Sequence, residues 1–188
     1  MADYHKMWEE LGMDVETHDQ LCEVLPQAFG DVYLSQENRP EGMDYYNFVV
    51  AEIHGVRPAE LIEHQKKGGK VFGTFCVYVP DEVVFAADAI ATGLCGGSQF
   101  WVPGGEKVLP TNTCPLIKAS VGARLDRTCP FFRIADMYVG ETTCDGKKKA
   151  WEILAEDVPV HVMDLPQMKR KKDVKAWADE SPYFPERL

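Results

Sequence analysis

Five of the six cysteines in this chain are spaced by 19, 19, 15 and 15 residues: Cys76, Cys95, Cys114, Cys129 and Cys144. Thiolates are soft ligands that suit zinc and iron–sulfur clusters. The chain has no CxxC pair, so a zinc ribbon or a thioredoxin-type redox pair has no support. The spacing matches whole strand–helix units instead. For any single cysteine the alternative is a buried structural role, which is common for this residue type.

The stretch "VGETTCDGKKKAWEIL" at 139–154 superficially resembles a phosphate-binding loop. Five residues separate Gly140 from Gly146, however, and Lys148 stands where a magnesium site would need a hydroxyl group. The residue inside the loop is Cys144. The pattern therefore predicts a loop that presents a thiolate rather than one that cradles phosphate.

The composition is that of one globular domain: 188 residues, 45% hydrophobic and 27% charged. The net charge of −10 argues against non-specific nucleic-acid binding, which needs a basic face. No apolar stretch of about 18 residues predicts a membrane span, and the polar N-terminus does not resemble a secretory leader. We therefore expect a cytoplasmic protein with no membrane partner, whose cysteines bind metal or do chemistry rather than form disulfides.

The pattern along the chain predicts two parts: a helical N-terminal segment, 1–41, and a cysteine-bearing α/β domain, 42–188. Two helices, at 43–55 and 58–69, open the second part. Short apolar strands then alternate with helices: strands at 70–75, 90–94, 135–141 and 158–164, and helices at 80–89, 115–125, 146–156 and 165–180. Residues 98–113, rich in Pro and Gly, are expected to form a loop. This alternation predicts an α/β fold with a parallel, Rossmann-like sheet of about four strands flanked by helices.

Four cysteines fall beside the ends of these strands and helices. Cys76 and Cys95 follow the first and second strands, Cys114 precedes the helix at 115–125, and Cys144 lies between the third strand and its helix. In a parallel sheet these positions share the carboxyl edge, where ligands bind. A helix N-terminus also favours the thiolate, the form that ligates metal. These four residues are the predicted metal ligands.

The other two cysteines are interpreted as structural. Cys129 follows the helix at 115–125, which should return the chain to the amino edge of the sheet, and Cys22 lies outside the sheet. A site of several thiolates with almost no histidine favours an iron–sulfur cluster over zinc.

The histidines and the lysine run are not predicted to bind a ligand. His54, His64 and His161 are expected to be packed or surface residues rather than ligands. The run Lys147–Lys149 could attract anionic cofactor groups, but a charge run that opens a helix is usually solvated.

Three segments resemble the 2-hydroxyacyl-CoA dehydratase and benzoyl-CoA reductase superfamily: "GTFCVYVPDEVVFAADAI", "LPTNTCPLIKAS" and "VGETTCDGKKKAWEIL". Within it, "GLCGG", "RTCPFF" and "TTCDGKKKAWE" look closest to the double-cubane cluster proteins. The resemblance runs from about Gly42 to Lys172.

The resemblance implies a cysteine-ligated iron–sulfur cluster, 4Fe–4S or double cubane, in an oxygen-sensitive protein. It also implies an ATP-hydrolysing activator that supplies low-potential electrons. By position, Cys76 and Cys114 match the family's cluster-binding cysteines, and Cys144 and Cys95 match positions suited to a larger cluster. Cys129 also matches a cysteine of the double-cubane proteins, so the resemblance and the topological argument differ at this residue.

Three functions are consistent with these features. The first is an iron–sulfur redox domain of a double-cubane-type, activator-coupled reductase. The second is part of a dehydratase that binds a 4Fe–4S cluster and acyl-CoA, although no acyl-CoA pocket or catalytic residue is located. The third is a non-catalytic interaction or cluster-carrier domain. Family subunits carry a second α/β domain, so we expect the isolated chain to bind a cluster weakly, to form homo-oligomers and to be nearly inactive.

Overall fold

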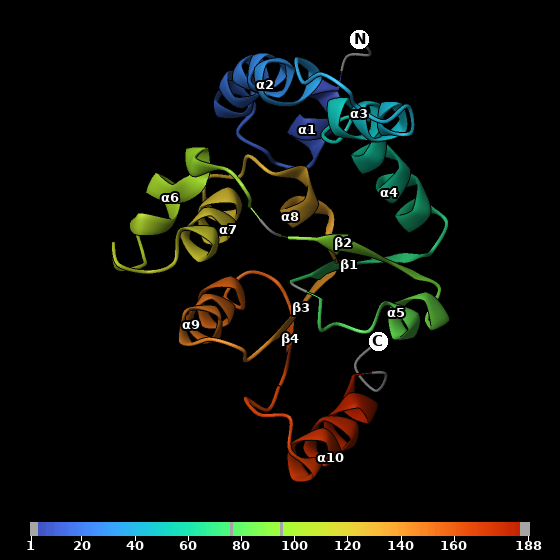
Figure 1. Ribbon diagram of the computed structural model, residues 1–188, viewed down its shortest axis with the longest axis vertical. Coiled ribbons are helices and arrows are strands. Elements are labelled where there is room, and N and C mark those ends of the chain that lie inside the picture. Colours follow the sequence, from blue (N-terminus) through green and yellow to red (C-terminus); the bar gives the residue numbers. More distant parts are fainter. Residues whose placement is uncertain (1–3, 76, 95, 185–188) are drawn as a thin grey trace.

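The centre of the molecule is a four-stranded sheet, seen in a computed structural model that describes residues 4–75, 77–94 and 96–184 (Figure 1). Its strands are β1 (Lys70–Thr74), β2 (Ala89–Gly93), β3 (Met137–Glu141) and β4 (Val160–Met163). They lie in the order β2-β1-β3-β4, and every pair is parallel. The predicted α/β fold with a four-stranded parallel sheet is confirmed.

Side chains alternate between the two faces of this sheet, as the strand period of two requires. On β3, Tyr138 packs into one core while Met137 and Val139 pack into the other. On β1, Val71 and Phe72 divide in the same way. Because both faces are buried, the strands are continuous apolar runs, which is why the sequence pattern located them.

Helices cover both faces of the sheet. The larger core lies against α4 (Val56–Lys66), α7 (Pro115–Leu125), α8 (Pro130–Ile134) and α9 (Asp145–Leu154). The smaller core lies against α5 (Asp81–Ala86) and α10 (Lys171–Glu180). Figure 1 shows α7 and α9 on one side of the strands and α5 on the other.

The path of the chain creates a switch point between β1 and β3. From β1 the chain passes through α5 to β2 on one side, and it then returns across β1 to reach β3 on the other side. From β3 it continues through α9 to β4 in the same direction. Ligands of open α/β sheets bind beside the carboxyl ends of the strands at such a point.

The N-terminal helices gather at one end of the molecule (Figure 1). They are α1 (His5–Glu10), α2 (Val15–Phe29), a π-helical turn η1 (Gly30–Leu34) and α3 (Met43–Ala51). The Asp14 carboxylate begins α2 by accepting a hydrogen bond from the Thr17 amide at 3.1 Å. In the described part of the chain, no helix is both long and apolar enough to cross a membrane.

The structure corrects several local expectations, among them the helix expected at 165–180, which begins only at Lys171. The segment 98–113 is not all loop, because it contains a 3-10 turn η2 (Gln99–Trp101) and α6 (Val102–Glu106), whose Gly104 and Gly105 pack closely on α7. Helix α8 was not predicted, since five residues are too few to show a helical period. Helix α5 ends at Ala86 rather than at 89, because Ala89 already begins β2. A final 3-10 turn, η3, spans Ser181–Tyr183.

Candidate metal centre

Cys114 caps the N-terminus of α7 and is exposed. Its carbonyl accepts the hydrogen bond of the Lys118 amide at 3.1 Å, which begins the helix. The Lys118 ammonium group then reaches back to the Thr111 carbonyl at 2.7 Å and to the Glu106 carboxylate at 2.6 Å. The loop before Cys114 is thus tied to the helix that follows it.

Cys144 caps the N-terminus of α9 and is also exposed. Its Sγ accepts a hydrogen bond from the Lys147 amide at 3.4 Å, and its carbonyl accepts one from the Lys148 amide at 3.2 Å. Since α9 follows β3 directly, this thiol lies at the carboxyl edge of the sheet, as predicted.

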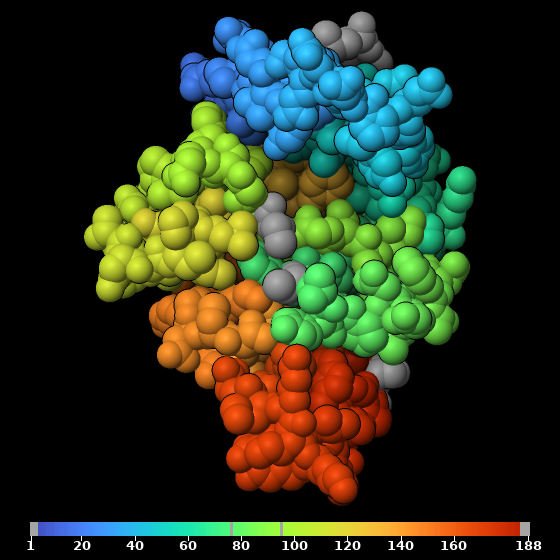
Figure 2. Space-filling view, viewed as in Figure 1, coloured from blue at the N-terminus to red at the C-terminus, as the bar shows by residue number. Residues whose placement is uncertain are grey.

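The first turns of α7 and α9 pack side by side. A Cβ atom built on Gly146 would lie 3.6 Å from Ile117 Cγ1, 3.8 Å from Thr113 Cγ2 and 4.0 Å from Cys144 Sγ. Figure 2 shows the α7 segment in yellow directly beside the α9 segment in orange. The N-terminus of α7, which carries Cys114, therefore also lies at the carboxyl edge.

Cys76 lies outside the described residues, but the contacts of its neighbour Phe75 are described. The Phe75 amide donates to the Val139 carbonyl of β3 at 3.1 Å, which extends the pairing of β1 with β3. The ring of Phe75 lies 5.5 Å from the Lys147 Nζ and packs edge-on against Trp151, both on α9. Phe75, the residue before Cys76, therefore lies against α9.

Cys95 also lies outside the described residues, and the next residue, Gly96, packs on α7. The Gly96 amide donates to Ser120 Oγ at 3.1 Å. A Cβ atom at Gly96 would lie 2.8 Å from the backbone of Ala119, so only glycine allows this approach. Gly96, the residue after Cys95, therefore lies against the helix that Cys114 begins.

The lysine run does not behave as one solvated group, which corrects the prediction for Lys147. This side chain is buried, and its ammonium group pairs with the Glu141 carboxylate at the end of β3 and hydrogen-bonds Thr143 Oγ1 at 3.0 Å. The second Glu141 oxygen accepts the Thr143 amide at 2.6 Å. A fully buried carboxylate needs such a partner, and the short loop from β3 to α9 supplies it. Lys148 and Lys149 are exposed, as expected.

Cys129 differs from the two exposed thiols. It caps α8 but is buried, and burial raises the pKa of its thiol to about 11, although two backbone amides of α8 oppose the shift. Helix α8 leads to Asp136, whose carboxylate accepts the Val71 amide at 2.8 Å at the start of β1. This position on the amino side agrees with the topological expectation for Cys129.

A family model for the D-component of 2-hydroxyglutaryl-CoA dehydratase matches residues 76–188. This chain belongs to that dehydratase family. Over 106 residues it is also 46% identical to "Putative dehydratase subunit YjiM" of Escherichia coli (strain K12), a match that covers 56% of this chain and 28% of that relative's length.

Membership of the dehydratase family confirms the resemblance drawn from the cysteine loops. The matched region begins at Cys76 and contains the other three predicted ligands, Cys95, Cys114 and Cys144. The N-terminal helices α1–α4 lie before it. The family model therefore covers β2, β3 and β4 with the helices between them, and it begins just after β1 ends at Thr74.

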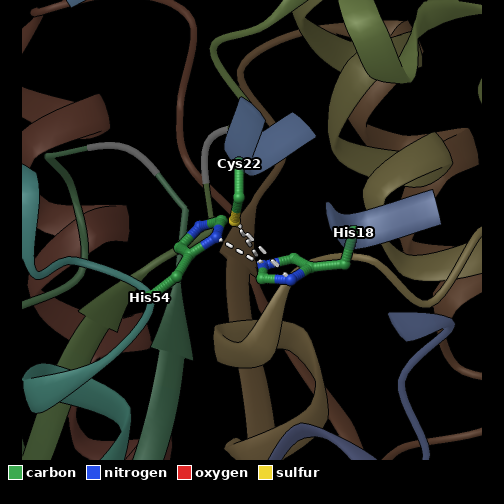
Figure 3. A group of neighbouring side chains, drawn as sticks. All are labelled: His18, Cys22 and His54. Atoms are coloured by element: carbon green, nitrogen blue, oxygen red, sulfur yellow. Dashed lines mark hydrogen bonds between the residues drawn. The ribbon is translucent and has the colours of Figure 1, made fainter. Parts of the chain in front are cut away.

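The histidines show one grouping that the sequence interpretation missed. His64 packs against Gly69, and the ring of His161 stacks on Phe184. His54, in contrast, meets His18 and Cys22 in a cluster in which His18 is buried and the other two are partly buried (Figure 3). The spacing of His18 and Cys22, four residues apart on one face of α2, was a readable signal, whereas His54 comes from a different segment.

Proposed function

We propose that this chain is the cluster-holding part of a 2-hydroxyacyl-CoA dehydratase-type subunit. In this proposal the thiolates of Cys76, Cys114 and Cys144 hold an iron–sulfur cluster at the carboxyl edge, with Cys95 close by. The observation that carries it is the contact of the first turns of α7 and α9 beside the β1–β3 switch point. Two cysteines cap these helices, and the other two adjoin residues that pack on them.

The donor set fits a cysteine-ligated cluster. Cys114 and Cys144 are exposed thiols, so a ligand can reach both without unfolding the core. The Lys147 amide that donates to Cys144 Sγ is the kind of donor that tunes cluster potential. When bound, a cluster would supply one-electron transfer at low potential.

The residues around these thiols hold the loops and exclude water. The buried Lys147–Glu141 pair fixes the loop that ends at Cys144. The rings of Phe75 and Trp151 pack against each other beneath the carboxyl edge of the sheet, with their centroids 5.4 Å apart. They keep water from the Lys147–Glu141 pair. Lys118 holds the loop that ends at Cys114.

A partner surface is part of the proposal. Apolar side chains stand exposed next to the cysteine positions: Val77 is 87% exposed, and Leu116 in the first turn of α7 is 41% exposed. The match covers 28% of the E. coli relative, whose remaining length has room for a second α/β domain. We propose that such a domain or subunit, or a second copy of this chain, covers the edge, and that an ATP-hydrolysing activator delivers electrons.

The double-cubane reductase is the finer alternative, and the number of bound irons separates the two. A single cubane requires about four irons and four sulfides per chain, and a double cubane requires about eight irons. The feature that favours the larger cluster is the resemblance of the Cys95 and Cys144 segments to the double-cubane proteins, whereas four thiolates by themselves suffice for one cubane.

Anaerobic reconstitution with iron and sulfide tests the proposal. We expect about four irons and four sulfides per chain, an EPR signal after reduction, and loss of both in Cys114→Ser and Cys144→Ser. Full iron content in both variants would contradict the proposed site. With a partner subunit and an activator present, anaerobic turnover of a 2-hydroxyacyl-CoA distinguishes a dehydratase from a non-catalytic cluster carrier.

A further inference from the structure

A second group of metal-ligand side chains lies among the N-terminal helices, away from the cysteine edge. His18 and Cys22 come from α2, and His54 comes from the connection between α3 and α4. One ligand atom from each lies within 4.8 Å of the others (Figure 3). We infer that His18, Cys22 and His54 form a zinc site that joins α2 to the α3–α4 connection.

Two of the three ligand–ligand distances are close to those that zinc requires, and the third, from Cys22 to His54, is within 4.8 Å. His18 Nε2 lies 2.9 Å from His54 Nδ1 and 3.6 Å from Cys22 Sγ. Zinc bonds of about 2.0 Å to nitrogen and 2.3 Å to sulfur, at tetrahedral angles, separate two nitrogens by about 3.3 Å and a nitrogen from sulfur by about 3.5 Å. The nitrogen pair must therefore open by about 0.4 Å.

The orientation of one ring must also change. Cys22 Sγ is almost equally far from the two nitrogens of the His18 ring, 3.7 Å from Nδ1 and 3.6 Å from Nε2. The sulfur therefore does not lie in the direction of the lone pair of either nitrogen. A turn of the His18 ring would direct the Nε2 lone pair toward an ion shared with the other two ligands. Without metal, the two imidazoles can share a hydrogen bond in the same place.

The walls of the cluster hold its members in position. The indole of Trp8 donates a hydrogen bond to the His54 carbonyl at 2.8 Å, and its ring lies 4.2 Å from the ring of His18. Phe131 of α8 packs edge-on against His54. Burial disfavours charge at all three ligands: it lowers the pKa of His18 and of His54 to about 4 and raises the pKa of the Cys22 thiol, so zinc would displace the Cys22 proton on binding.

The ligand types favour zinc among the common ions. One thiolate and two imidazoles suit a borderline metal, whereas magnesium and calcium prefer oxygen ligands. Among the described residues, the cluster of candidate ligands contains three members, so a water would take the fourth position. None of these residues belongs to the proposed cluster site, so this inference does not rest on the proposed function.

The test uses the full chain with Cys76, Cys95, Cys114 and Cys144 replaced by serine, so that the edge cysteines cannot take up zinc. This parent should bind about one Zn²⁺ per chain in competition with a chromophoric chelator. With Co²⁺ in place of zinc, it should show a thiolate-to-cobalt charge-transfer band. Added zinc should also raise its Tm, because the ion binds the folded state.

Two variants in this parent background remove single ligands. Cys22→Ser and His54→Gln should each weaken zinc binding by at least about 100-fold and abolish the rise in Tm, and Cys22→Ser should also remove the charge-transfer band. The matched control is His64→Gln, which should bind zinc like the parent. Circular dichroism of the metal-free variants checks that they fold.

Equal zinc affinity in the parent, Cys22→Ser and His54→Gln would overturn the inference. So would a parent that binds no zinc, or a cobalt complex without the thiolate band. In the chain with all cysteines present, iron content after anaerobic reconstitution gives the second readout. Cys22→Ser should keep the iron content of the wild type, whereas Cys114→Ser should lose most of it. The two sites can therefore fail independently.

Discussion

Two Thr-Cys-Pro tripeptides, at 113–115 and 128–130, have the same local structure but opposite surroundings. In each, the cysteine is the N-cap of a helix and the proline occupies its first turn. Cys114 is exposed beside the N-terminus of α9, whereas Cys129 is buried on the amino side of the sheet, and burial raises the pKa of its thiol to about 11.

This difference shows that the edge of the sheet, more than the local motif, decides what a cysteine can do. Helix α7 runs from one edge toward the other, so the two tripeptides at its ends face different environments. Cys144 shares the environment of Cys114 although its own sequence is Thr-Cys-Asp.

The largest expected difference is in the reactivity of the two cysteines. At pH 8, a pKa of about 11 leaves roughly one Cys129 thiol in a thousand ionised, and the core shields it further. Iodoacetamide labelling of the native apoprotein, followed by peptide mass spectrometry, should therefore modify Cys114 and Cys144 at least about 100-fold faster than Cys129. Similar rates at Cys114 and Cys129 would break the comparison.

The same pKa shift predicts how stability depends on pH. The folded state holds the Cys129 proton more tightly than the unfolded state, whose thiol ionises near pH 8.5. This contribution to stability is complete below about pH 8.5 and is lost as pH rises toward 11. In urea unfolding, the free energy of unfolding of Cys129→Ala should fall less between about pH 8.5 and pH 11 than that of the wild type.

The buried ion pair beneath Cys144 gives the next largest effect. Lys147→Met leaves the Glu141 carboxylate buried without its cation, which should cost about 3–5 kcal/mol of unfolding free energy. The matched control is Lys148→Met at the next, exposed position, which should change stability by less than about 0.5 kcal/mol. Urea denaturation of both variants measures the difference.

A double variant sharpens this result. Glu141→Gln in the Lys147→Met background removes the uncompensated charge, so it should recover part of the lost stability. If the double variant loses as much unfolding free energy as the sum of the losses in Lys147→Met and Glu141→Gln, the two side chains do not act as a pair.

A smaller effect on stability is expected from a substitution at Gly96, the residue after Cys95. In Gly96→Ala the new methyl group meets the Ala119 backbone, which should cost about 1–3 kcal/mol. Gly97→Ala is the control, since a Cβ atom there has nothing within 4 Å, and its stability should change by less than about 0.5 kcal/mol. Equal stability of the two variants, by thermal unfolding, would argue against the close approach of this loop to α7.

The strands and the cysteine edge could be predicted because simple patterns encode them. Short apolar runs located β1 to β4 to within about two residues, and parallel topology then placed Cys114 and Cys144 at one edge. The assignments at Cys76 and Cys95 remain predictions, since both positions lie outside the described residues.

Other features depend on contacts between distant segments and could not be read from local patterns. The burial of Lys147 depends on Glu141, and a lysine run alone predicts exposure. The glycines of 98–113 suggested a loop, but they allow α6 to pack on α7. His54 joins the cluster on α2 only through the packing of the N-terminal helices, which have no internal pattern that predicts it.

The most direct test of the account exchanges one atom in each Thr-Cys-Pro tripeptide and counts iron. Cys114→Ser and Cys129→Ser are reconstituted anaerobically, and bound iron and sulfide are measured against the wild type. The account predicts that Cys129→Ser keeps the iron content of the wild type while Cys114→Ser loses most of it. Loss of iron in folded Cys129→Ser, or its retention in Cys114→Ser, would contradict the claim that the carboxyl edge holds the cluster.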